Sequence, residues 1–403
     1  MLFLKRLPGI VYSHRHSASI VFCLFLVFIY LLFHWGFVCT NLEPWNHVKY
    51  LCNQYQKGLV VGNLCHPLCE EGRIGSFSCQ TFHAGKEVVF SGVKDENSRL
   101  VFKLARHLDQ QSQSTVYWLE NGVEKYPTEA EFTKMIVDHI GNRLNTSVSP
   151  DLASSLGRFS QSVESHSMDR HLEMREVWTL LQDNEYLLAS LYSGSDVFPR
   201  VLGSCGQYFA LEYLEPAIEG HVAAEEGVWP TRVKLAVLVL DLLQEIDNSV
   251  GEGFSLCDIK PSHFGLSPSS GKMKFLDLDV ALPRTVVNTI TADGSTCNIN
   301  TDCSLFDCRS KCNMDTHKCD SPQTNDNLQT VCEKIFLGWT VSGSVITPGL
   351  LMAPQTPSSL ASLLRQCADP DGDGVYTAPS EQVRERLTAT LQEMDKALSL
   401  DNY

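Results

Sequence analysis

The sequence has no excess of basic residues. Its 403 residues include 32 Lys and Arg against 47 Asp and Glu, which gives a net charge of -15. This balance argues against a nucleic-acid partner and offers no basic face to anionic lipid. Internal repeats and low-complexity segments are also absent. The chain is long enough for one large domain or two modest ones, each with an apolar core.

Long apolar runs are absent except for one, over residues 17–39. Its length matches the ~20 residues that span a bilayer. Lys5, Arg6 and Arg15 precede it, and no basic residue follows it closely, so the positive-inside rule places the short N-terminus in the cytosol. A cleaved signal peptide would have a shorter apolar region and a small-residue cleavage site. The run therefore predicts an uncleaved signal anchor, with the rest of the chain in the lumen.

Cysteine is abundant, with fifteen residues, of which ten gather in two clusters. Cys65 and Cys69 are spaced like half of a zinc site, but no second tight Cys/His pair completes it. Clustered cysteines in a lumenal chain favour disulfides, and the six of the late block predict three of them. The disulfide candidates are Cys52, Cys65, Cys69, Cys79, Cys297, Cys303, Cys308, Cys312, Cys319 and Cys332.

Residues 235–283 organise the rest of the chain, because they combine a helical pattern, a polar loop and a short apolar strand. The loop contains Asp258, Lys260 and His263, and the strand ends at Asp277. An acid followed by a lysine two residues later, and by another acid ~20 residues on, has the spacing of a kinase catalytic loop and its metal-binding acid. A β-hairpin with solvated acids at its ends explains this stretch equally well.

Two further residues fit the same chemistry. Lys103 lies within an apolar strand pattern that pairs with residues 87–93 across a polar turn, where a kinase places its phosphate-contacting lysine. Glu185 lies near the apolar face of a helix expected over residues 173–192 and is the natural partner of that lysine. An edge-strand lysine facing solvent is the alternative. The Gly-x-Gly-x-x-Gly phosphate loop is missing, with Gly85 and Gly92 as its only candidates.

Two surface features suggest modification and ion binding. Asn145-Thr146-Ser147 is a glycosylation sequon. Asp369, Asp371 and Asp373 match the start of a calcium-binding EF-hand loop, but position 12 is Ser380, so an acidic turn is the favoured interpretation.

The chain resembles the cysteine-rich divergent protein kinase domain (DIPK) family of single-pass type II endoplasmic reticulum membrane proteins. The resemblance extends over nearly the whole chain, and its specific runs lie around Trp178, Gly203-Ser204-Cys205-Gly206 and Cys257-Asp258. It implies an α+β bilobal kinase-like fold with disulfide-rich insertions, preceded by one transmembrane helix. The implied parts are a cytosolic tail (1–16), an anchor (17–39), a cysteine-rich stem (40–83), an N-lobe (84–215) and a C-lobe (216–403) with a cysteine-rich insertion (297–332).

By this resemblance, Asp258 and Lys260 are catalytic, Lys103 and Glu185 bind the nucleotide, and Asp277 and His263 hold the metal. ATP with Mg²⁺ or Mn²⁺ would be the cofactors. An EF-hand-like insert would span residues 162–173, ending at Glu173, but His166 and Ser167 occupy positions that need an oxygen ligand and a glycine.

The sequence departs from the kinase pattern at three points. Leu256-Cys257 replaces the His-Arg before the catalytic aspartate, His263 replaces an asparagine, and Asp277-Leu278-Asp279 lacks the usual glycine. We therefore expect one of two functions. One is a lumenal kinase-like phosphotransferase that acts on an unknown protein or glycan of the secretory pathway. The other is an inactive pseudokinase that binds a lumenal partner.

Overall fold

The computed structural model describes residues 21–23, 25–27, 42–79, 88–95, 98–105, 116–159, 168–222, 229–249, 253–341, 344–372 and 375–400. No helix among these residues is long and apolar enough to cross a membrane. Most of the predicted anchor, residues 17–39, lies outside the described residues, as do Gly85, Asp373 and residues 160–167. The chain divides into two compact units, residues 1–105 with 202–211, and residues 106–201 with 212–403.

The first unit is built on a five-stranded sheet with the strand order β1-β2-β3-β7-β6. The strands are β1 (Ile74–Cys79), β2 (Val89–Lys94), β3 (Ser98–Leu104), β6 (Val201–Cys205) and β7 (Tyr208–Glu212). β2 and β3 form the predicted hairpin, with Val89 opposite Lys103. Alternation along β3 buries Leu100 and Phe102, which places Lys103 on the other face of the strand.

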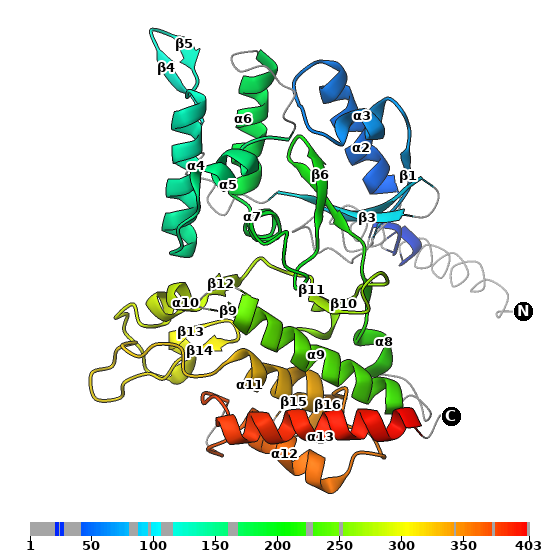
Figure 1. Ribbon diagram of the computed structural model, residues 1–403, viewed down its shortest axis with the longest axis vertical. Coiled ribbons are helices and arrows are strands. Elements are labelled where there is room, and N and C mark those ends of the chain that lie inside the picture. The colour runs from blue at the N-terminus through cyan, green and yellow to red at the C-terminus, as the bar shows by residue number, and fades with distance from the viewer. Residues whose placement is uncertain are drawn as a thin grey trace, which may run out of the picture. The chain divides into compact units, whose positions relative to one another are not determined.

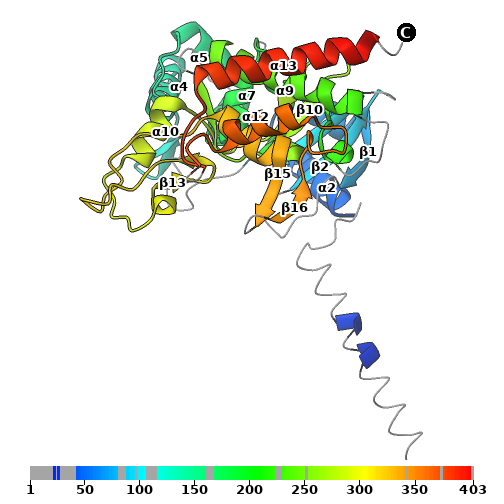
Figure 2. The same ribbon diagram turned by 90° about the horizontal axis from the view of Figure 1, so that it is seen from below.

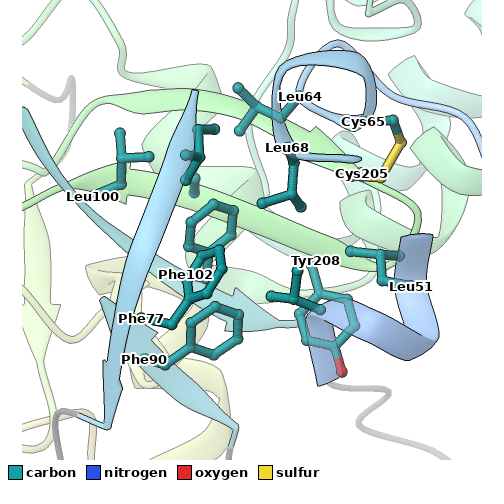
Figure 3. Packing of buried hydrophobic residues seen from close by; sticks show 13 residues of the cluster. Leu51, Leu64, Cys65, Leu68, Phe77, Phe90, Leu100, Phe102, Cys205 and Tyr208 are labelled. Carbon is teal, nitrogen blue, oxygen red and sulfur yellow. A yellow bond between two sulfur atoms is a disulfide. The ribbon is translucent and has the colours of Figure 1, made fainter. Parts of the chain in front are cut away.

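Aromatic side chains fill the core of this unit (Figure 3). The rings of Phe90 and Phe102 are stacked at 5.1 Å between centroids, and Phe77 meets Phe90 edge-on at 5.8 Å. Two stem helices, α2 (Leu42–Gln56) and α3 (Cys65–Cys69), supply Leu51 and Leu68 to the same cluster. The stem is therefore part of the core that supports the sheet.

The Gly203-Ser204-Cys205-Gly206 run is where β6 meets the stem. Ser204 donates its amide to the Asn63 side chain at 2.8 Å, and Cys65 forms a disulfide with Cys205. Gly203 has a φ of +146°, and a Cβ there would collide with Asn63. Glycine is thus required at this position by the close approach of the stem.

The second unit begins with helices. They are α4 (Glu129–Leu144), α5 (Pro150–Leu156), α6 (Met168–Leu181) and α7 (Asn184–Leu191), with a small hairpin of β4 (Trp118–Glu120) and β5 (Val123–Lys125). The single helix predicted over residues 173–192 is wrong. Asp183 accepts a hydrogen bond from the Tyr186 amide and caps a new helix, so the chain breaks into α6 and α7.

The rest of this unit is arranged around α9 (Trp229–Ser249), which contains the helical pattern at the start of residues 235–283. The final helix α13 (Glu381–Leu400) runs beside α9 (Figures 1 and 2), and Lys234 pairs with Asp395 across them at 3.3 Å. Further elements of this unit are β8 (Glu215–Pro216), α8 (Glu219–Val222), α10 (Arg284–Thr291), η2 (Asn300–Cys303), β13 (Ser304–Leu305), β14 (Cys308–Arg309), α11 (Asn327–Val331), η3 (Cys332–Leu337), β15 (Gly338–Val341), β16 (Ser344–Pro348) and α12 (Ser358–Ala368).

Short strands carry the loops of the predicted site. β9 (Phe254–Leu256) pairs antiparallel with β12 (Ala281–Pro283), and β10 (Phe264–Leu266) pairs with both β11 (Met273–Phe275) and β8. β10 and β11 thus form a hairpin directly after the polar loop. The pairing of β10 with β11 and of β9 with β12 positions the two loops of the predicted site, one after β9 and one after β11.

Candidate catalytic and metal-binding site

The loop after β9 brings the first predicted catalytic residues together. Asp258 follows Cys257, and its carboxylate accepts a hydrogen bond from the Lys260 ammonium at 2.6 Å. Lys260 is more than half exposed and Asp258 is partly buried. Asp258 and Lys260 therefore form a charged pair at the edge of the site, as their spacing in the sequence predicts.

His263 ends the short 3-10 helix η1 (Pro261–His263), and its ring connects this loop to Asp277. Nδ1 lies 2.9 Å from the backbone carbonyl oxygen of Asp258, and Nε2 lies 3.2 Å from Asp277 Oδ2. The Leu276 amide donates to the His263 carbonyl at 2.8 Å, which fixes the two segments relative to each other. Burial lowers the pKa of His263 below its ordinary value, although the Asp277 carboxylate acts in the opposite direction.

The Asp277-Leu278-Asp279 segment is held by α7. Leu278 is fully buried, and Asn184 donates its side-chain amide to the carbonyls of Leu278 at 2.6 Å and Ala281 at 3.1 Å. Asp277 Oδ1 accepts a hydrogen bond from the Asp279 amide at 3.2 Å. Asn184 was missed in the sequence, and its position beside Glu185 at the start of α7 is the signal that could have suggested it.

Asp258, His263 and Asp277 can each offer one ligand atom, and these three atoms lie within 4.8 Å of one another. Two carboxylates and an imidazole are a suitable donor set for a divalent metal ion. When bound, such an ion supplies positive charge that stabilises phosphate oxygens. Of the predicted metal ligands, the structure thus brings Asp277 and His263 together and adds Asp258.

The predicted nucleotide-binding residues belong to different units. Lys103 is half-buried in β3 of the first unit, and Glu185 is buried in the first turn of α7 in the second unit. Their burial agrees with the strand and helix positions that the sequence indicates. The ion pair between them stays a prediction.

The cysteine-rich insertion is bonded to the loop that carries Asp258. A disulfide joins Cys257 to Cys308, the Asp307 amide donates to the Cys257 carbonyl at 2.7 Å, and the Asp307 carboxylate accepts from the Ile259 amide at 2.8 Å. Asn327 accepts a hydrogen bond from the Leu256 amide at 2.8 Å. Asp307 and Asn327 could not be assigned from the sequence, because nothing in their local pattern marks them.

The disulfides correct one expectation. The late block does not form three disulfides within itself: only Cys297–Cys312 and Cys303–Cys319 are internal, while Cys308 and Cys332 pair outside it. Among the disulfides that the structure describes in full, Cys65–Cys205, Cys257–Cys308 and Cys332–Cys367 each join a predicted cysteine to one beyond the predicted set. In the stem, Cys52 pairs with Cys69, and Cys79 is also disulfide-bonded. All ten candidates are thus oxidised, as predicted.

The remaining candidate sites lie elsewhere in the second unit. The Glu173 carboxylate pairs with the buried Arg170 at 2.7 Å and accepts the Phe159 amide at 2.6 Å. Asp371 accepts a hydrogen bond from Thr377 at 2.7 Å. Neither arrangement tests calcium binding. The calcium site at Asp369, Asp371 and Asp373 therefore stays a prediction. Asn145, the sequon residue, is exposed at the end of α4, and glycosylation there stays a prediction.

Comparison with solved structures gives weak similarities. The complex of Rv3197 with erythromycin from Mycobacterium tuberculosis shares 17% identity over 55% of this chain and 51% of that chain, with a TM-score of 0.24. Vaccinia related kinase 3 shares 11% identity over 86% of this chain and 96% of that chain, with a TM-score of 0.35. This chain spans about half of the first structure, and at these TM-scores neither similarity defines its function.

Family models give a direct match. The model described as "N-term cysteine-rich ER, FAM69" matches residues 10–156, and the model described as "Protein-kinase domain of FAM69" matches residues 177–370. Together they include most of both units, and the second includes Glu185, Asp258, His263 and Asp277. The expected kinase-like α+β fold with disulfides is thereby confirmed. The chain belongs to the FAM69 (DIPK) family.

Proposed function

We propose that this chain is a divergent kinase-like phosphotransferase of the secretory pathway, anchored by one N-terminal span in the endoplasmic reticulum membrane with its C-terminal part in the lumen. The observation that carries the proposal is the convergence of Asp258, His263 and Asp277 within 4.8 Å. The disulfides support an oxidising compartment. The substrate would be an unidentified lumenal protein or glycan.

Each residue has a role that its contacts support. Asp258 would accept the proton of the attacking hydroxyl and orient it, and Lys260, paired with it at 2.6 Å, would compensate its charge. Asp277 and His263 would hold the divalent metal. Lys103 would contact the phosphates of ATP and Glu185 would pair with Lys103, as the corresponding residues do in kinases.

The test is nucleotide binding by the full-length chain, purified in detergent with its disulfides formed. We expect ATP with Mg²⁺ or Mn²⁺ to raise the melting temperature, because a ligand that binds only the folded state stabilises it. Asp277→Ala and Lys103→Ala should each abolish the rise. Matched controls are Asp315→Ala and Lys125→Ala, which remove exposed charges of the same type. Phosphate transfer from labelled ATP to a panel of secretory proteins and glycans would then be measured.

The second candidate is a pseudokinase that serves as a lumenal binding module. Cys257 favours it, because the position before the catalytic aspartate is held in a disulfide and cannot provide the arginine of active kinases. Absence of any ATP-dependent shift in the wild-type chain with Mg²⁺, Mn²⁺ or Ca²⁺ would exclude the kinase proposal and favour this module. Capture of lumenal partners would then be the next measurement.

A further inference from the structure

The His263 ring lies between two oxygen atoms. Nδ1 is 2.9 Å from the Asp258 carbonyl oxygen, and Nε2 is 3.2 Å from Asp277 Oδ2. A carbonyl oxygen can only accept, so the proton of a neutral ring must be on Nδ1. Nε2 then directs its lone pair at a carboxylate oxygen. Two lone pairs at this separation repel each other unless a positively charged species lies between them.

The separation of these atoms suits a shared metal ion. Two ligands that each lie about 2.1 Å from one ion are about 3.0 Å apart in octahedral and about 3.4 Å apart in tetrahedral geometry. The observed 3.2 Å lies between these values. A charge-assisted N–H···O hydrogen bond would be shorter, about 2.7–2.9 Å.

The surroundings are those of a metal-binding histidine. Such a histidine usually donates its other ring N–H to a carbonyl or carboxylate, which fixes the ring, and Nδ1 does this with the Asp258 carbonyl. The other Asp277 oxygen, Oδ1, is engaged by the Asp279 amide, so Oδ2 is the one directed at the ring. Asp258 supplies a third ligand within 4.8 Å.

We propose that Asp258, His263 and Asp277 form a site that binds Mn²⁺ or Zn²⁺ in preference to Mg²⁺ and Ca²⁺, and that it does so without nucleotide. Imidazole suits the first-row transition metals, whereas Mg²⁺ and Ca²⁺ take oxygen ligands. This inference concerns the metal site of the proposed function and rests on that function. It adds the class of metal and the independence from ATP.

The test uses the full-length chain after treatment with a chelator. Mn²⁺ is added and the loss of its free electron paramagnetic resonance signal is followed, with Zn²⁺, Mg²⁺ and Ca²⁺ as competitors. We expect Zn²⁺ to displace Mn²⁺, whereas Mg²⁺ and Ca²⁺ should displace it only in large excess. Bound Mn²⁺ should show ¹⁴N coupling from the imidazole in electron spin echo spectra.

The decisive variant is His263→Asn, which installs the oxygen-bearing side chain that kinases carry at this position. It should remove the ¹⁴N coupling and weaken Mn²⁺ binding by about 10-fold or more. His317→Asn is the matched control: His317 is exposed in the same unit and has a left-handed backbone that asparagine tolerates. The melting temperature without metal shows whether either variant is misfolded. If His263→Asn is misfolded, the ¹⁴N coupling of the wild-type chain decides whether an imidazole binds the metal.

The outcomes separate this inference from the proposed function. Absence of ¹⁴N coupling in the wild-type chain, or Mg²⁺ competing as well as Zn²⁺, overturns the metal assignment even if ATP binds. Mn²⁺ binding through His263 in a chain that binds no ATP supports the metal assignment, while the phosphotransferase proposal fails.

Discussion

The Asp307 carboxylate accepts a hydrogen bond from the backbone amide of Ile259, the residue that follows Asp258, over 2.8 Å. The same carboxylate pairs with the Lys334 ammonium at 2.6 Å. An acid of the cysteine-rich insertion thus fixes the loop that carries the candidate catalytic residue. In many kinases a phosphorylated activation segment helps to order the site, whereas here covalent and hydrogen bonds link the insertion to the loop.

Asp307→Ala should destabilise the chain. Removing the carboxylate leaves the Ile259 amide without its partner and Lys334 without its counter-charge, which costs about 1–3 kcal/mol of the free energy of unfolding. Urea denaturation measures this cost. Asp315→Ala is the control, because Asp315 is an exposed acid of the same insertion. Equal stabilities of the two variants would contradict the role of Asp307.

The Cys257–Cys308 disulfide should contribute more to stability than the disulfides within the insertion. It links residues 51 positions apart, against 16 for Cys303–Cys319. The chain-entropy model therefore predicts a loss of about 4 kcal/mol for the double change Cys257→Ala and Cys308→Ala, and about 3 kcal/mol for Cys303→Ala with Cys319→Ala. Thermal unfolding and expression yield of the full-length chain would be compared for the two pairs. Unchanged folding without Cys257–Cys308 would show that the insertion needs no covalent link to the loop that carries Asp258.

Lys274 in β11 should be a major stabilising residue. Its side chain is 1% exposed, and its ammonium pairs with Glu212 at 2.6 Å and Asp196 at 2.8 Å. Lys274→Met leaves both carboxylates without this partner, and we expect the free energy of unfolding to fall by about 3 kcal/mol.

Lys272→Met is the matched control for Lys274. Lys272 is two residues away and about half exposed, and it pairs with the similarly exposed Glu245 at 2.6 Å. Exposed ion pairs contribute about 0–1 kcal/mol. Chemical denaturation of both variants should therefore show a clear difference, and a similar small loss in each would mean that Lys274 is not buried in solution.

His139 in α4 should make stability depend on pH. Its Nε2 lies 2.9 Å from the Leu181 carbonyl, and its ring lies 5.2 Å from that of Trp178. Burial, mainly, and the charge of Arg143 lower the pKa of His139 in the folded state, although the Leu181 carbonyl acts to raise it.

The direction of the pH effect follows from this lowered pKa. The unfolded chain binds a proton to His139 near pH 6.5, whereas the folded chain does so only at lower pH. The stabilising contribution is thus present above pH 6.5 and is lost as the pH falls through the folded pKa. His139→Gln should reduce the fall in melting temperature between pH 7 and pH 5, and an equal fall in the wild-type chain and the variant would contradict this role of His139.

The sequence alone determined the local patterns and the family. An apolar strand pattern across a polar turn predicted the β2–β3 hairpin with Lys103, and a helical pattern at the start of residues 235–283 predicted α9. The acid–lysine–acid spacing located Asp258, Lys260 and Asp277. These patterns are visible because they depend on residues that are near one another in the chain. The cysteine clusters likewise indicated disulfides, because clustered thiols in a chain expected to be lumenal favour them.

Only the tertiary structure decided which distant residues meet. Cys205, Cys257 and Cys367 bond to partners 140, 51 and 35 residues away, and no local pattern encodes such pairings. Asn184 and Asp307 act on the site because helix packing and the insertion bring them to backbone groups far away in sequence. The orientation of His263, which determines the metal proposed for the site, depends on a carbonyl and a carboxylate that only the folded loops place on opposite sides of its ring.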